Sequence, residues 1–352
     1  MGVPWINEEP LSVAQCPLIR SAACGALAVA LIAAGATLSA AQSLFEIAYS
    51  GTCDQLRSAL RAGASARDRD RNGVTPLMFA ARGNPDPGVV SLLLGAGANV
   101  EEVDRDGRTP LMYAGMGTPT PEVITLLLRA GARVYWRSND GVTPLMYAAG
   151  KNRNPAITRV LAEAGAGIED RNEGGATPLM YAAGDNPVAE VASTLISLGA
   201  RADNRDRTGA TPLMHAAAGN TNPELITLLL KSGARLTDRD AYGQTSLMLA
   251  AWNNPNPEVV CALLAAGARV NDRNHEGMSP LMLAACHNRN PDVVTTLLRA
   301  GADRTLISPA GETARDYAKD NTALEGSQAL QDLDTGGRRV WLPVPSTGWW
   351  DR

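Results

Sequence analysis

The chain has 352 residues, more than one hydrophobic core usually organises, so several domains or an array of repeats is expected. Aromatic residues make up only 4% of the sequence while glycine occurs 34 times, and abundant small residues suit helices packed closely at regular intervals. The formal net charge is −4 and no long run of lysine or arginine occurs, so composition gives no reason to expect a nucleic-acid partner.

Residues 1–41 have the pattern of a secretory signal peptide. Residues 21–43 contain no charged side chain and follow Arg20, and the small residues at 39–41 fit cleavage before Gln42. Two glutamates further upstream depart from the usual pattern. Because about 20 apolar residues can span a bilayer, a permanent membrane anchor formed by the same segment stays open as the alternative.

Cleavage at that position leaves three cysteines, Cys53, Cys261 and Cys286, whose spacing matches no zinc or redox motif. We expect Cys261 on an apolar helix face, where a free thiol behaves as a small hydrophobic group. A disulfide between Cys261 and Cys286 remains the alternative.

A 34-residue period governs the rest of the chain. The motif T-P-L-M, with serine in place of threonine or proline in two copies, recurs with the first residue at Thr75, Thr109, Thr143, Thr177, Thr211, Thr245 and Ser279. A glycine precedes each motif by two residues and a Gly-Ala pair closes each unit, as in Gly97-Ala98. The fold must therefore be built from one structural unit used repeatedly.

Each unit contains the signals for two helices. Thr75 can cap a first helix that begins at Pro76, and the small side chains that follow let a neighbouring helix approach closely. A second helix starts after an Asn-Pro pair such as Asn222-Pro223, is rich in aliphatic residues, and stops at a glycine. One such pair cannot bury its apolar face alone, so the units must be stabilised by stacking on one another.

The chain resembles the ankyrin-repeat family, because the pattern G-x-T-P-L-x-x-A-A, followed by an aliphatic helix and x-G-A, occurs seven times in register. The expected export signal makes it similar to exported bacterial members of that family. The resemblance covers about residues 43–333 and implies an all-α ankyrin-repeat solenoid with an N-terminal cap, seven 34-residue repeats, a C-terminal cap and short β-hairpin-like turns. The histidine that usually follows T-P-L is methionine here, which we expect to lie in the core.

Three domains follow from these patterns: the signal peptide or anchor at 1–41, the solenoid at 42–333, and a flexible tail at 334–352 that contains three tryptophans and two prolines. Residues 44–64 resemble an N-terminal capping repeat. Residues 313–333 resemble a C-terminal one, because polar side chains replace the apolar ones of the motif. The tail could fold back on the solenoid or contact a partner.

Residues with catalytic or metal-binding patterns are absent from the sequence. No phosphate-binding glycine loop, G-x-S-x-G or H-E-x-x-H motif occurs, and the three histidines are too scattered to form a metal site. The aspartates and arginines of the turns alternate, which predicts solvated charge instead of a calcium loop. We therefore expect neither an enzyme nor a small-molecule cofactor, and another protein as the partner.

In ankyrin-repeat proteins partners usually contact the concave side, formed by the fingertips of the hairpins and the exposed ends of the first helices. The resemblance carries this surface onto Arg71, Arg82, Arg105, Arg108, Met116, Tyr135, Trp136, Asn139, Asp140, Lys151, Arg207, Tyr242, Gln244, Trp252, His275 and His287. Tryptophan and arginine often dominate binding energy, so Trp136 and Trp252 are the candidate hot spots, with local packing as the alternative. Phe79, Tyr113, Tyr147 and Tyr181 recur at one position and are expected to be framework, with a partner-facing role as the alternative.

The sequence thus favours a protein-binding scaffold in the periplasm or secreted from the cell. A narrower hypothesis is an accessory protein that stabilises a periplasmic enzyme, a role of some similar bacterial ankyrin proteins. Two alternatives remain. The protein could be a membrane-anchored tether, if residues 21–43 stay uncleaved, or a secreted effector directed at a host.

Overall fold

The computed structural model describes residues 43–334, and these form a stack of helix pairs with no β-strand among them. The expected signal segment at 1–41 and the tail that follows Asp334 lie outside the described residues. The helices are α1 (Leu44–Ser50), α2 (Cys53–Arg61), α3 (Pro76–Gly83), α4 (Pro87–Gly95), α5 (Pro110–Gly117), α6 (Pro121–Arg129), α7 (Pro144–Lys151), α8 (Pro155–Glu163), α9 (Pro178–Asp185), α10 (Ala189–Ser197), α11 (Pro212–Gly219), α12 (Pro223–Lys231), α13 (Ser246–Asn253), α14 (Pro257–Ala265), α15 (Pro280–His287), α16 (Pro291–Arg299), α17 (Ala314–Tyr317) and α18 (Gln328–Asp334), with short 3-10 helices η2 (Ala318–Asp320) and η3 (Thr322–Leu324) between the last two.

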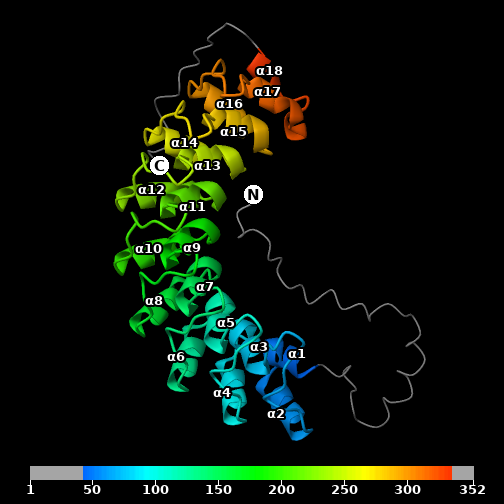
Figure 1. Cartoon of the computed structure of the whole chain (residues 1–352). Helices are drawn as coiled ribbons and strands as arrows, with labels where there is room; N and C mark the ends of the chain where they lie inside the picture. Colours follow the sequence, from blue (N-terminus) through cyan, green and yellow to red (C-terminus); the bar gives the residue numbers. More distant parts are fainter. Residues whose placement is uncertain (1–42, 335–352) are drawn as a thin grey trace, which may run out of the picture. The chain divides into compact units, whose positions relative to one another are not determined.

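Helix pairs follow one another in chain order (Figure 1). The first helix of each pair packs against the first helix of the next, and the second helices form a parallel layer in the same way. The pair α1/α2, the seven pairs from α3 to α16, and the pair α17/α18 correspond to the expected N-terminal cap, repeats and C-terminal cap.

The residues that the sequence predicts as helix caps act as caps in the structure. The Thr75 hydroxyl oxygen accepts a hydrogen bond from the Met78 N–H at 3.4 Å, and Pro76 is the first residue of α3. The Met78 sulfur in turn accepts a bond from the Thr75 N–H at 3.4 Å, so this methionine contributes to the cap as well as to the core. In α12 the Asn222 side chain accepts from the Glu224 N–H at 3.0 Å.

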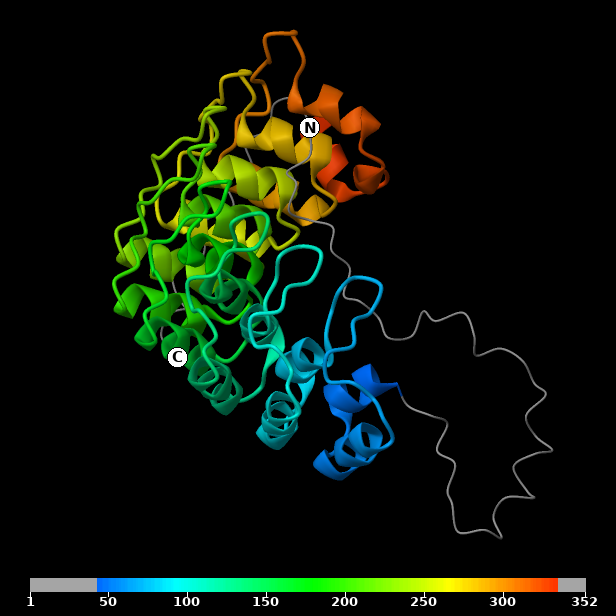
Figure 2. The same cartoon turned by 60° about the horizontal axis from the view of Figure 1, so that its bottom comes forward.

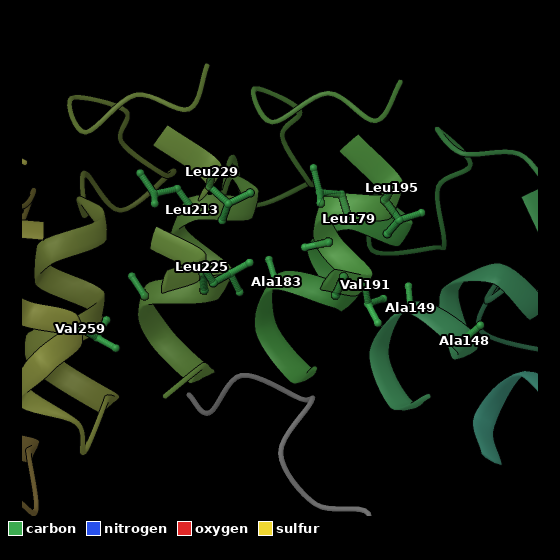
Figure 3. Packing of buried hydrophobic residues seen from close by; sticks show 14 of the residues in the cluster. Ala148, Ala149, Leu179, Ala183, Val191, Leu195, Leu213, Leu225, Leu229 and Val259 are labelled. Atoms are coloured by element: carbon green, nitrogen blue, oxygen red, sulfur yellow. The ribbon is translucent and has the colours of Figure 1, made fainter. Parts of the chain in front are cut away.

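The core runs continuously along the stack between the two helix layers. In Figure 3, Leu179 lies beside Leu195 within one pair and Leu213 beside Leu229 in the next, and all four are fully or almost fully buried. The recurring methionines from Met78 to Met282 are buried too, as expected. The prediction for Cys261 was wrong: its side chain is exposed on α14, because this position faces away from the neighbouring helices, and both it and Cys286 are free thiols.

Buried asparagines connect successive repeats at the ends of the first helices. The Asn220 amide donates to the carbonyl oxygens of Ala183 and Asn186 in the preceding repeat, at 3.0 and 2.7 Å. Equivalent bonds are made by Asn84, Asn152, Asn186, Asn254, Asn288 and Asn321. Thr118 occupies this position in one repeat. We call these contacts the asparagine ladder.

Candidate partner-binding surface

The loop before each first helix forms a finger whose shape is fixed by one polar residue. In the finger at 206–210 the Asp206 carboxylate accepts hydrogen bonds from the N–H groups of Thr208 and Ala210, at 2.8 and 3.0 Å. Gly209 has φ +80°, a left-handed conformation that the turn requires. The equivalent anchors are Asp70, Asp104, Ser138, Asn172, Asp240, Asn274 and Ser308. These are the hairpin-like turns that the sequence predicts.

Backbone hydrogen bonds join the tips of neighbouring fingers into a row. The Arg105 N–H donates to the Asn72 carbonyl at 3.0 Å, and the His275 N–H donates to the Tyr242 carbonyl at 3.0 Å. Figure 2 shows the loops projecting side by side from the stack. Most of the bonds in this row are made by the main chain, although the Asn139 side chain also donates to the Arg105 carbonyl at 3.0 Å. The row lacks this bond at Pro309, which has no N–H to donate.

Where the residue nine positions after the anchor is polar, its side chain ties the first helix to the finger, as at Tyr113, Tyr181 and His215. The Tyr113 hydroxyl donates to the buried Asp104 carboxylate at 2.7 Å, and the His215 ring contacts Asp206 at 2.9 Å. Burial and the bond to Asp104 raise the pKa of Tyr113 well above its usual range. These contacts give the recurring aromatic position the expected framework role.

A second row of contacts, which the sequence interpretation missed, runs along the fingers. The Arg205 guanidinium donates to the Gly209 carbonyl in its own finger at 2.9 Å and to the Arg239 carbonyl in the next at 3.0 Å. It also pairs with Asp238 of the next repeat at 2.6 Å. Arg69, Arg137, Arg171 and Arg239 make equivalent contacts. We call this row the arginine ladder. Its signal was the recurrence of arginine every 34 residues with a polar residue 33 positions later.

Most of the candidate partner-contacting residues lie at the surface. Those exposed are Arg71, Arg105, Tyr135, Asn139, Asp140, Lys151, Arg207, Tyr242, His275 and His287, and those half-buried are Arg82, Arg108, Met116, Trp136 and Trp252. Gln244 must be withdrawn, because only 6% of it is exposed. It follows the turn glycine directly, and its N–H donates to the Asp240 anchor at 2.8 Å, which draws it under the finger.

Several of these residues already have partners within the array. Arg108 pairs with the buried carboxylate of Asp104 at 2.7 Å and with Asp106, so much of its charge is balanced internally. Lys151 pairs with Asp185 of the following repeat at 3.3 Å, and both side chains are well exposed. Exposed pairs of this kind add about 1 kcal/mol or less to stability, so a partner could replace them at little cost.

The two tryptophans differ in their surroundings. Trp252 packs against the core, and its ring contacts that of His287 with 5.3 Å between centroids. Partial burial lowers the pKa of His287. Trp136 lies beneath the Arg133 guanidinium, 5.4 Å from the ring centroid, next to Tyr135, which is 66% exposed. The aromatic surface of Tyr135 and Trp136 is therefore the more accessible of the two candidate hot spots.

The sequence model of the family described as ankyrin repeats (three copies) matches residues 44–135, 117–206, 184–274 and 247–334. The chain belongs to the ankyrin-repeat family. Its structure is similar to that of the human ASB11 ankyrin repeat domain, with a TM-score of 0.54 and 28% sequence identity over 65% of this chain and 99% of that one. A search of curated proteins gives no match.

Ankyrin repeats are generally non-catalytic modules that bind other proteins, and the fingers and helix ends described above are where this ankyrin-repeat array presents variable side chains. Within residues 43–334 no cluster of three or more histidine, cysteine or acidic side chains has the arrangement needed to hold a metal ion. No helix in the same range is long and apolar enough to cross a membrane.

Proposed function

We propose that this ankyrin-repeat protein is a binding scaffold for another protein and acts outside the cytoplasm. The proposal rests on a difference between the framework residues, which recur from repeat to repeat, and the exposed fingertip residues, which vary. The anchors, ladders and core recur from repeat to repeat, whereas the exposed tip position changes from Arg71 to Arg105, Asn139, Glu173 and Arg207. Recurring framework with changing exposed residues is the arrangement of a surface adapted to one partner.

A binding experiment tests this surface. The Tyr242 side chain is 63% exposed at a fingertip and makes none of the contacts described, which use only the Tyr242 main chain, so Tyr242→Ala should leave folding intact. We expect cross-linking in the native compartment to capture one protein, and Tyr242→Ala combined with Tyr135→Ala to weaken that capture at least tenfold, since buried aromatic anchors contribute 2 kcal/mol or more, roughly, to an interface.

The matched control is Glu224→Ala, which changes an exposed residue of the second-helix layer in α12. It should leave the capture unchanged. Equal loss in the fingertip and Glu224 variants, or no capture by a folded wild-type chain, contradicts the proposed surface.

Export is supported by the uncharged stretch at 21–43 and the small residues before Gln42. The partner would then be a periplasmic or secreted protein, and an enzyme that the scaffold stabilises is the narrower form of the proposal. Sequencing the N-terminus of the mature protein tests it, with Gln42 expected first. The length of the same stretch supports the second candidate, a membrane-anchored tether. Carbonate extraction that leaves the full-length chain in the membrane fraction favours the tether.

A further inference from the structure

Side-chain hydrogen bonds join the loop after each first helix to the preceding repeat at two positions. The first position is the rung of the asparagine ladder. The second lies two residues later, where the Asn222 amide donates to the Pro187 carbonyl at 3.3 Å. Asn154, Asn256 and Asn290 make the same second bond. Within residues 43–334, only the junction of α3 and α4 with α5 and α6 has neither bond, and we call it the α3–α5 junction.

Threonine occupies both positions at the α3–α5 junction. The Thr118 hydroxyl donates to the Thr120 carbonyl at 3.2 Å and accepts from the Thr120 N–H at 3.4 Å, so it is used within its own loop. The Thr120 hydroxyl oxygen is buried, has no hydrogen-bond partner and does not cap α6. The carbonyls of Ala81 and Asn84 in the preceding repeat therefore lack the amide donor that their counterparts have at the other junctions. A buried hydroxyl without a partner is itself a cost to stability.

The helix pairs that precede this junction are tied firmly to each other. The Asn84 amide donates to the carbonyls of Ala48 and Gly51, at 2.9 and 3.0 Å. The rings of Phe45 and Phe79 are in edge contact, with 5.6 Å between their centroids. Helices α1–α4 are therefore one unit at the N-terminal end of the stack (Figure 1).

The fingers, in contrast, remain joined across the α3–α5 junction. The Arg105 N–H donates to the Asn72 carbonyl at 3.0 Å. The Arg69 guanidinium donates to the Val103 carbonyl at 3.4 Å and pairs with Glu102. The junction is thus hydrogen-bonded along the fingers, whereas among the described residues its helix ends are held by the packing of α3 against α5 without side-chain hydrogen bonds.

We propose that the α3–α5 junction is an opening point of the array, at which α1–α4 separate as one unit from the helices that follow. Each repeat is stabilised by its neighbours, so a stack opens first at the junction that contributes least. Opening begins at the helix ends, because the fingers stay joined. Arg82 and Met116 lie at the ends of α3 and α5, on either side of the junction, so opening changes the spacing of two candidate partner-contacting residues. This consequence for binding rests on the proposed function, whereas the opening itself does not.

Amide hydrogen exchange of the intact chain, followed by mass spectrometry, tests the proposal. We expect the helical amides of α1–α4 to share one level of protection, about tenfold or more below that of α7–α14. Thr118→Asn combined with Thr120→Asn supplies both missing bonds, and it should slow exchange throughout residues 44–95 by about tenfold while leaving α11–α14 unchanged. The matched control is Thr221→Asn, an exposed residue in a loop that already has both asparagines, which should leave exchange in residues 44–95 unchanged.

The reverse exchange provides a second test at the other end of the array. Asn288→Thr combined with Asn290→Thr removes both bonds between α13/α14 and α15/α16, and it should make α15–α18 exchange about tenfold faster as a unit. Faster exchange in α1/α2 than in α3/α4 overturns the proposal, because it indicates fraying from the end of the chain. Unchanged rates in either double variant also overturn it, as does equal slowing by Thr221→Asn.

Discussion

Removing one rung of the asparagine ladder should destabilise the array far more than its size suggests. Asn220 is 4% exposed, and Asn220→Ala removes two donated bonds, at 3.0 and 2.7 Å, and one bond accepted from the Asn222 N–H at 2.9 Å. At about 1 kcal/mol for each net hydrogen bond, the expected loss is about 3 kcal/mol. Two carbonyl groups of the preceding repeat are also left without this donor, which adds to the loss.

Urea unfolding of the described array followed by circular dichroism measures this loss. The matched control is Asn253→Ala in the same ladder region, because Asn253 is exposed and makes a single long bond of 3.4 Å to the Ala218 carbonyl. We expect the control to change the free energy of unfolding by about 0.5 kcal/mol or less. If the two variants unfold at the same urea concentration, the ladder does not hold the repeats together and the reasoning fails.

Three further changes test the same framework. Thr118→Asn should restore the missing rung and raise the free energy of unfolding by about 1 kcal/mol in the same urea assay, and a loss would mean that this junction is built differently. Tyr113→Phe removes the 2.7 Å bond to the buried Asp104 carboxylate and should cost about 1–3 kcal/mol, whereas an unchanged midpoint would contradict the framework role of this position. Burial is the largest single influence on the pKa of Asp206 and acts to raise it, but the hydrogen bonds from His215, Thr208 and the Ala210 N–H, with the interaction with the His215 charge, together outweigh burial, so the pKa lies below the ordinary 3.8. The stability that ionised Asp206 contributes is therefore present at neutral pH and is lost as the pH falls through the pKa of Asp206 in the folded state. In acid titrations, the difference in free energy of unfolding between wild type and Asp206→Asn should shrink below pH 3.8. A difference that grows there would refute this reasoning.

The repeat, its two helices and its caps could be predicted because each depends on residues close together in the sequence. Thr75, Pro76 and Met78 form a cap within four positions, and glycine ends the second helix through its own backbone freedom. The ladders could not be predicted in the same way. Asn220 bonds to backbone carbonyls 34 and 37 positions away, and a carbonyl carries no signature in the sequence.

The sequence could predict which residues lie near the fingertips, but it could not predict which of their side chains are exposed. The spacing placed Tyr242 and Gln244 on either side of the turn glycine, and the structure leaves the first at the tip and draws the second beneath it. Trp252 and Trp136 were equivalent candidates in the sequence. Only the packing of Trp252 against the core and the contact of Arg133 with Trp136 separate them.

Both ladders reach only from one repeat to its neighbour, and the residue that donates a bond also offers its own carbonyl to the next in line: Asn186 receives from Asn220, which receives from Asn254. Duplicating the part of the gene that encodes one 34-residue repeat would therefore recreate every such bond at the new boundary between repeats. The length of the protein can grow or shrink in evolution by whole units, while the tips are free to diversify one at a time.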